Sequence, residues 1–225
     1  TYFWDVTDPS NMIPIDTVRV DARTVNDVKI SEDGTIGIIT REGASNRKNG
    51  MVVLDVSNPR EVKILSEYNE GLTGGVHNAF IYDNHVYAVN NGRRYDIINI
   101  EDPENPETVG RFELDTPGHS IHDVWIEDGI AYSSNWSDGV VAVDIGQQEG
   151  EMGAAGGSPE NPVKLGSYAY PSGRNHAAFP FKSESTGDFY VIAGDESFPN
   201  GLPTRNNPVA AAGWIHFIKF DSWDQ

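Results

Sequence analysis

Apolar residues in this chain fall in short runs separated by polar turns, a pattern typical of β-strands. The stretch 118–145 shows it best and predicts strands at 121–126, 130–133 and 140–145. Between the first two strands, Glu127-Asp128-Gly129 carries the Asp-Gly signal of a tight hairpin. The third run is apolar almost throughout, as expected for a strand that is covered on both faces.

The same unit returns about every 45 to 50 residues, a period that indicates a solenoid or a propeller. Copies of the third strand end in an Asp-Pro or Asn-Pro turn, and copies of the first strand begin with histidine or asparagine. The third-strand copies lie at 3–6, 53–56, 97–100, 142–145 and, weakly, 218–221, and the first-strand copies at 26–30, 77–81, 122–126 and 176–180. A fourth strand follows the proline-containing turn. The predicted fold class is therefore all-β, a β-propeller of four-stranded antiparallel blades.

The motifs Leu54–Pro59 (LDVSNP) and His122–Val124 (HDV) resemble the LVIVD-repeat β-propeller family. The resemblance extends over nearly the whole chain, although the last unit lacks the Asp-Pro turn. It implies a β-propeller fold and little about chemistry. Because the family is often found on bacterial or archaeal cell surfaces or in secreted proteins, it also implies an extracellular, periplasmic or cell-surface location.

The register of the repeats predicts three complete and two partial blades within residues 1–225. The chain opens on a third strand, 2–6, and its last predicted strand, 214–220, is also a third strand. We therefore expect one β-propeller domain that is either a segment of a longer propeller or a ring closed irregularly.

Composition excludes several kinds of function. The net charge of −18, from 16 basic and 34 acidic residues, argues against nucleic-acid binding, which needs a basic surface. The chain has no cysteine, so disulfides, Cys-ligated zinc and iron–sulfur clusters are excluded. It also lacks the long apolar run of a membrane span.

Three histidines occupy equivalent positions at the start of predicted innermost strands: His77, His122 and His176, with Asn26 in the fourth copy. Imidazoles that converge on a channel suit zinc, iron or copper, which would make the chain a metal-dependent enzyme with Asp195, Glu196 or Asp27 as acid–base candidates. The alternative is that each side chain bonds neighbouring backbone and locks one blade to the next. Weak calcium binding at the Asp-Pro and Asn-Pro turns is also open.

The loops expected at the same end of the blades hold half of the basic residues of the chain. They are Arg23, Arg41, Arg47, Lys48, Arg93, Arg94, Arg174 and Arg205. Arginine suits carboxylate and phosphate groups, so this face is a candidate site for an anionic ligand. Trp136 could stack on a sugar or an apolar ligand there, or it could cap the blade. Asp195 lies in the same group of loops. The alternative is that these charges only hold adjacent blades together.

Three functions remain open from the sequence. The first is an extracytoplasmic scaffold without catalytic activity that binds a partner protein, a glycan or an anionic small molecule. The second is the metal-dependent enzyme with a cluster of axial histidines. The third is a structural subunit of a larger surface assembly.

Overall fold

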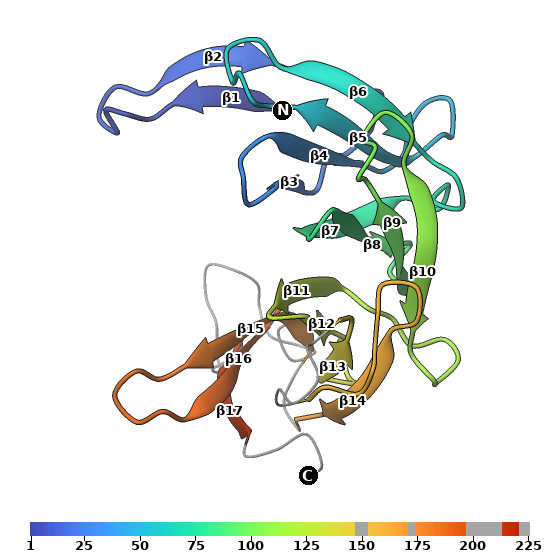
Figure 1. Ribbon diagram of the computed structural model, residues 1–225, viewed down its shortest axis with the longest axis vertical. Helices are drawn as coiled ribbons and strands as arrows, with labels where there is room; N and C mark the ends of the chain where they lie inside the picture. The colour runs from blue at the N-terminus through green and yellow to red at the C-terminus, as the bar shows by residue number, and fades with distance from the viewer. Residues whose placement is uncertain (147–152, 171–173, 197–212, 221–225) are drawn as a thin grey trace, which may run out of the picture. The chain divides into compact units, whose positions relative to one another are not determined.

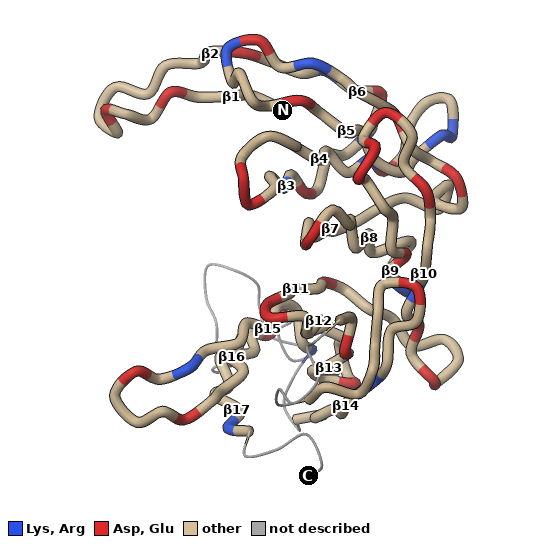
Figure 2. The backbone as a smooth tube through the Cα atoms, in the orientation of Figure 1, with Lys and Arg blue, Asp and Glu red and all other residues tan. Residues whose placement is uncertain are grey.

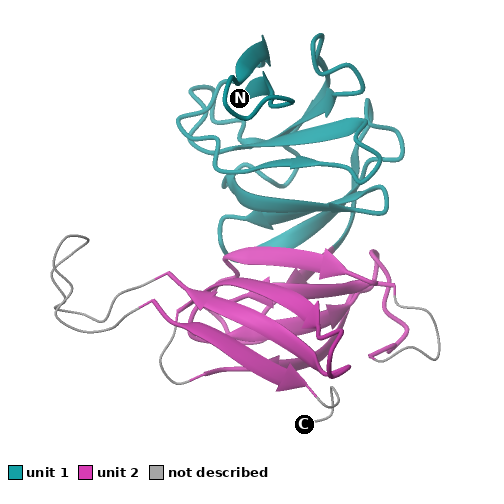
Figure 3. Ribbon diagram, turned by 90° about the vertical axis from the view of Figure 1, so that its left-hand side faces the viewer, with its two compact units in different colours: residues 1–110 teal, residues 111–225 magenta. Residues whose placement is uncertain are grey.

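The computed structural model describes residues 1–146, 153–170, 174–196 and 213–220. It divides the chain into two compact units, residues 1–110 and 111–225 (Figure 3). The described residues form β-strands and turns, and none of them belongs to a helix that could cross a membrane. We number the five sheets in chain order.

Unit 1 contains three antiparallel sheets (Figure 1). Sheet 1 has two strands, β1 (Tyr2–Asp5) and β2 (Ile13–Thr17). Sheet 2 consists of β3 (Val28–Ile30), β4 (Ile36–Arg41), β5 (Gly50–Asp55) and β6 (Lys63–Tyr68). Sheet 3 consists of β7 (Val76–Tyr82), β8 (His85–Asn90), β9 (Arg94–Asn99) and β10 (Glu107–Glu113), and β10 runs across the boundary between the units.

Unit 2 contains the other two sheets, which are also antiparallel (Figure 1). Sheet 4 consists of β11 (Asp123–Glu127), β12 (Ile130–Ser134), β13 (Val140–Asp144) and β14 (Val163–Tyr168). Sheet 5 consists of β15 (Asn175–Lys182), β16 (Phe189–Asp195) and β17 (Ile215–Phe220).

The predicted all-β class is confirmed. The predicted number of strands in each repeat is also confirmed: among the described residues, the five sheets hold two, four, four, four and three strands in chain order. The hairpin at Asp128-Gly129 is confirmed as well, because Glu127 pairs directly with Ile130. Two of the first strands, β3 and β11, begin later than predicted, whereas β7 and β15 begin one residue earlier. In sheet 2, for example, the N–H of Asp27 bonds the hydroxyl of Thr40 instead of a strand backbone, and β3 starts only at Val28.

Within each unit, successive sheets pack face to face. We call the side of a sheet that faces the next sheet in the chain its forward face, and the other side its backward face. Ile38, Met51 and Val53 on the forward face of sheet 2 share one buried cluster with backward-face residues of sheet 3. Those partners are Ala79, Val86, Ala88 and Ile98.

The same arrangement recurs in the other two sheet pairs. Phe3 of sheet 1 packs on Ile39, Val52 and Leu54 of sheet 2. In unit 2, the forward face of sheet 4 packs on the backward face of sheet 5, through Tyr132, Val140 and Ala142 on one side and Ala178, Val191, Ala193 and Ile218 on the other. In the pairs of sheets 2 and 3 and of sheets 4 and 5, alanines pack against larger side chains, which fills the space between the sheets.

A β-bulge recurs at one position of the repeat. The register between the third strand and the outer strand shifts at Phe3/Trp4, at Val53/Leu54 and at Ala142/Val143. The unpaired extra residue belongs to the outer strand and is always aliphatic: Ile15, Leu65 and Leu165. Because a bulge bends its strand, it lets Leu65 and Leu165 pack against the clusters between the sheets.

Acidic side chains outnumber basic ones along both units (Figure 2), and in unit 1 many are held by hydrogen bonds within turns. The hydroxyl and N–H of Ser10 bond the Asp8 carboxylate, and this lowers its pKa from the usual 3.8. The pKa of Asp55 is lowered in the same way by Ser57. In all, the pKa is lowered for Asp5, Asp8, Asp16, Asp21, Asp33, Asp55 and Asp102 of unit 1.

We expect the stability of unit 1 to fall in acid. A carboxyl group with a depressed folded-state pKa contributes stability above its unfolded pKa, and the contribution is lost as the pH falls through the folded value. The groups concerned are the seven aspartates named above. Hydrogen exchange followed by mass spectrometry between about pH 5 and about pH 2.5 measures the change. Protection in unit 1 that stays constant over this range would contradict this account.

Candidate metal-binding site

Two of the equivalent histidines meet in unit 2. His122 directly precedes β11 of sheet 4, and His176 is the second residue of β15 in sheet 5. Their rings lie 4.3 Å apart between centroids, with their planes inclined by 35°. His122 is buried, and its Nδ1 lies 3.1 Å from the carbonyl oxygen of His176. Since a carbonyl only accepts, Nδ1 carries the proton there, and Nε2 keeps the lone pair that could bind a metal ion.

Glu196 joins the two histidines. It directly follows the last residue of β16, the strand that pairs with β15, so the sheet itself brings it to the level of His176. The N–H of Glu196 bonds the carbonyl oxygen of Arg174, which fixes its backbone. One ligand atom from each of His122, His176 and Glu196 lies within 4.8 Å of the other two.

A short backbone bridge supports this cluster. Trp136, in the loop between β12 and β13, exchanges two N–H···O=C bonds with Asn175, the residue before His176, at 3.1 and 3.0 Å. Trp136 has φ of 50°, a left-handed conformation that is rare for a bulky side chain and costs about 1–3 kcal/mol. Its indole meets the His122 ring edge to face at 4.7 Å. The strained loop therefore holds an aromatic wall beside the histidine pair.

Asp195 lies inside unit 2, where its carboxylate cannot reach an external ligand directly. Its side chain is only 2% exposed, and one carboxylate oxygen lies 3.3 Å from Nε2 of His216. The ring of Tyr170 stacks on His216 at 4.0 Å. Burial, followed by the nearby Asp195, raises the pKa of Tyr170 well above its usual value. Asp195 thus belongs to a buried polar group next to the cluster rather than to its open side.

In unit 1 the same repeat position makes a polar contact between sheets. Nδ2 of Asn26, ahead of β3, lies 2.6 Å from Nδ1 of His77 in β7. The same Nδ1 is 3.2 Å from a carboxylate oxygen of Glu42. Asn26 and His77 therefore contact each other through their side chains, whereas the alternative to a metal site predicted bonds to neighbouring backbone. Among the described residues, the group that could hold a metal contains His122 and His176 but takes Glu196 as its third member.

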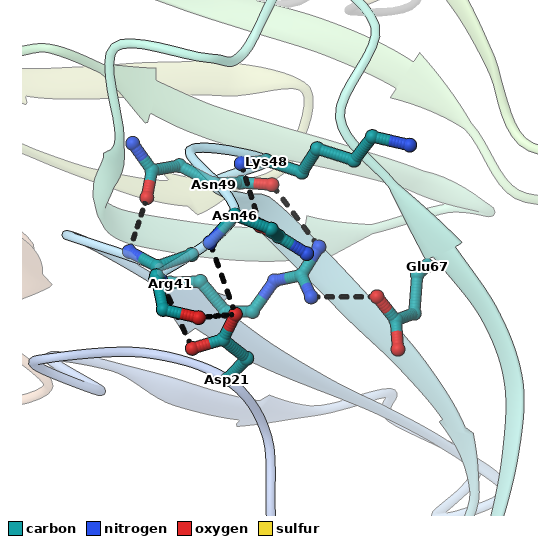
Figure 4. Close-up of polar contacts among 8 residues, drawn as sticks. Asp21, Arg41, Asn46, Lys48, Asn49 and Glu67 are labelled. Carbon is teal, nitrogen blue, oxygen red and sulfur yellow. Dashed lines mark hydrogen bonds and ion pairs between the residues drawn. The ribbon is translucent and has the colours of Figure 1, made fainter.

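Arg41 is the clearest departure from the predicted anion-binding face. Its side chain is only 1% exposed. It donates to a carboxylate oxygen of Glu67 at 2.7 Å and to the backbone carbonyl of Asn49 at 3.1 Å (Figure 4). The Asn49 side chain in turn bonds Ala44 and the carbonyl of Thr73. Arg41 therefore organises the loop between β4 and β5 and cannot contact an external anion, contrary to the prediction.

The other predicted ligand-binding residues have different surroundings. Arg94 is engaged within its own sheet, because its Nε donates to both carboxylate oxygens of Asp96 at 3.0 Å. Arg93 and Arg174 are exposed, and Trp136 is half-buried against His122. His119, three residues before His122, pairs with Asp138 at 2.6 Å and lies outside the cluster. Arg205 falls outside the described residues.

Comparison with solved structures bears on the fold. An auxiliary nutrient-binding protein from Bacteroides thetaiotaomicron gives a TM-score of 0.50 at 11% identity, covering 94% of this chain and 55% of that one. The C-terminal domain of Pseudomonas aeruginosa PilY1 gives 0.46 at 13% identity, covering 82% and 45%. The β-propeller domain of Swd1 from Myceliophteria thermophila gives 0.43 at 9% identity, covering 91% and 74%.

The chain spans about half the length of the first solved structures it matches. No family model matches it, and no curated protein matches it in sequence. The resemblance to the LVIVD repeat therefore stays a prediction. What the fold defines is a class: an all-β repeat protein built from face-to-face antiparallel sheets. The likeness to the nutrient-binding protein, at 11% identity, concerns the fold alone.

Proposed function

We propose that the chain is part of a β-propeller binding scaffold whose second unit binds one divalent transition-metal ion through His122, His176 and Glu196. The observation that carries the proposal is the approach of these three ligand atoms to within 4.8 Å from two sheets. The repeated sheets and their equivalent bulges support the propeller.

The donor set selects the kind of metal. Two imidazole nitrogens and one carboxylate oxygen suit zinc or iron(II) better than calcium or magnesium, which prefer oxygen ligands. With bonds of about 2.0–2.1 Å, the ligand atoms of a tetrahedral zinc lie roughly 3.3 Å apart. The three atoms are at most 4.8 Å apart, so the side chains must move inward to coordinate the ion, and Glu196 is exposed.

The protein groups around the cluster favour an ion there. The His176 carbonyl that accepts from Nδ1 of His122 would orient that ring and raise the basicity of Nε2, as such outer partners do at known zinc sites. Without a cation, the carboxylate of Glu196 would repel the anionic ligand that the sequence suggests. A metal held by three protein ligands keeps an open position, where an anionic small molecule could bind as a further ligand.

The test is metal titration of the chelator-treated chain by calorimetry, with Zn²⁺ and with Co²⁺, whose visible spectrum reports coordination. We expect one ion per chain. His176→Ala and His122→Ala should each weaken affinity at least about 100-fold, since loss of an outer-sphere partner alone costs roughly 10–100-fold. Glu196→Gln should also weaken affinity, because it removes the negative ligand.

Two histidine variants serve as controls. His119→Ala removes a histidine of unit 2 that pairs with Asp138, and His77→Ala removes the ligand predicted from sequence. Both should leave affinity unchanged within about twofold, since neither residue belongs to the cluster. Metal affinity that is unchanged in His176→Ala, or that falls as much in His119→Ala as in His176→Ala, would contradict the proposed site.

A further inference from the structure

A pocket of about 560 Å³ opens between sheets 2 and 3 at the end where their first and second strands are joined. Its walls are the turn between β3 and β4, the turn between β7 and β8, and the residues that follow β9. All of them fall within residues 31–103, so the pocket lies inside one compact unit. Its volume is in the range of sites that hold a small organic molecule.

The buried part of the pocket lining is apolar. Ile100 belongs to the buried cluster between sheets 2 and 3, and Ile36 and Ile81 pack against that cluster. Tyr82 also lines the pocket and is partly buried. The hydrocarbon part of a ligand would be removed from water against these side chains, which is favourable.

The exposed charged groups of the lining are all acidic. They are Glu32, Asp33, Asp83 and Glu101. Among the described residues that line the pocket, none is lysine, arginine or histidine. The Asp33 carboxylate accepts from the hydroxyl of Ser31 at 2.6 Å and from the N–H of Thr35 at 3.0 Å, and these bonds lower its pKa. The entrance therefore attracts a cation and repels an anion.

The repeat shows why space is left at this place. Counting along the paired strands, Phe189 and Phe220 of sheet 5 take the positions of Asn84 and Ile100 in sheet 3. Both phenylalanines pack against the cluster between sheets 4 and 5, with their rings 6.5 Å apart. The smaller side chains of Asn84 and Ile100 leave room between sheets 2 and 3 for a ligand.

We propose that this pocket binds a small organic ammonium ion, with its hydrocarbon part against the isoleucines and its charged nitrogen among the carboxylates. The isoleucines favour such a ligand over a bare calcium or magnesium ion, which takes its ligands from oxygen atoms. The four carboxylates favour it over a neutral or anionic molecule of the same shape. The pocket lies in unit 1 and shares no residue with the metal-binding site proposed in unit 2.

Amide-resolved NMR spectroscopy of the chelator-treated chain, titrated with phenylethylammonium, tests this proposal. We expect saturable shifts in the turn 31–36, in the turn 81–84 and at residues 100–101. Binding should weaken at high salt, because the carboxylates are exposed. Phenylethanol and phenylpropionate carry a similar hydrocarbon part without the positive charge, and both should bind at least about fivefold more weakly.

Three variants separate the two parts of the pocket. Asp83→Asn combined with Glu101→Gln removes two exposed charges and should weaken phenylethylammonium binding about five- to tenfold. Glu104→Gln combined with Glu107→Gln removes two exposed charges outside the lining, so this matched control should bind within about twofold of the wild type. Ile100→Phe introduces the residue found at this position in sheet 5, and by filling the pocket it should weaken binding at least about tenfold. If Ile100→Phe alters the circular dichroism spectrum, the two charge variants decide alone.

The metal site is tested separately in the same experiment. His176→Ala should bind phenylethylammonium as the wild type does, so a failure of the metal site leaves this pocket unaffected. Equal affinity for phenylethylammonium and phenylethanol would overturn the proposal. So would equal weakening in the two charge variants, shifts confined to residues outside the pocket, or Ca²⁺ binding to these carboxylates without any binding of phenylethylammonium.

Discussion

Replacing Gly139 by alanine is expected to lower the free energy of unfolding of unit 2 by at least about 3 kcal/mol. Gly139 directly precedes β13 and has φ of +70°. A Cβ there would lie 2.1 Å from the carbonyl oxygen of Tyr168 in the outer strand. Neither backbone can move away without breaking the pairing of Val140 with Tyr168. The substitution therefore combines a left-handed conformation with a clash against backbone.

The chain contains a glycine equivalent to Gly139, which is Gly50, and a control glycine with positive φ but no close neighbour, which is Gly34. Gly50, which begins β5, has φ of +97°, and its Cβ would lie 2.2 Å from the carbonyl oxygen of Tyr68. Gly50→Ala should destabilise unit 1 by a similar amount. Gly34 also has positive φ, +74°, but no atom lies within 4 Å of its Cβ position, so Gly34→Ala should cost only about 1–2 kcal/mol.

Urea unfolding monitored separately in the two units by hydrogen exchange measures these changes. If Gly34→Ala and Gly50→Ala cost the same, the close approach of the outer strand is not what selects glycine at the start of the third strand.

Arg41→Met is expected to destabilise unit 1 by about 2 kcal/mol. Methionine fills most of the space, but it donates neither to Glu67 nor to the carbonyl of Asn49, which then loses its bond to Arg41 inside the protein. The loss should loosen the loop between β4 and β5, and hydrogen exchange should rise over residues 42–49. Urea denaturation measures the change in the free energy of unfolding.

Glu67→Gln separates the ion pair from the rest of the Arg41 effect. The Glu67 side chain is 54% exposed, so the pair itself should contribute less than about 1 kcal/mol. If Glu67→Gln costs as much as Arg41→Met, the ion pair and not the buried bond to Asn49 stabilises the loop.

Local signals explain which parts of the fold could be predicted. The Asp128-Gly129 turn and the proline-ended third strands depend on residues adjacent in sequence, so the sequence placed most strands within a few residues. The repeat also allowed contacts between distant parts of the chain to be predicted. Residues at the start of equivalent first strands lie close together, as His122 does to His176 and Asn26 to His77.

The remaining features depend on packing that no local pattern encodes. Glu196 reaches the histidines only because β16 pairs with β15 in one register. The sequence had suggested it as an acid–base candidate and not as a metal ligand. The burial of Arg41 comes from the loop that folds over it. Asp195 is enclosed by Tyr170 and His216, which are 25 and 21 residues away in the chain.

The aliphatic residue at the bulge also limits how the repeats could be recombined. Ile15, Leu65 and Leu165 add one position to the outer strand, so that side chains on either side of it alternate in opposite phase. Consider a chimera in which one of these blades receives an outer strand without the extra residue. On one side of the missing bulge, the side chains of that outer strand would point to the opposite face of the sheet. A recombined blade should therefore take its third strand and its outer strand from the same repeat.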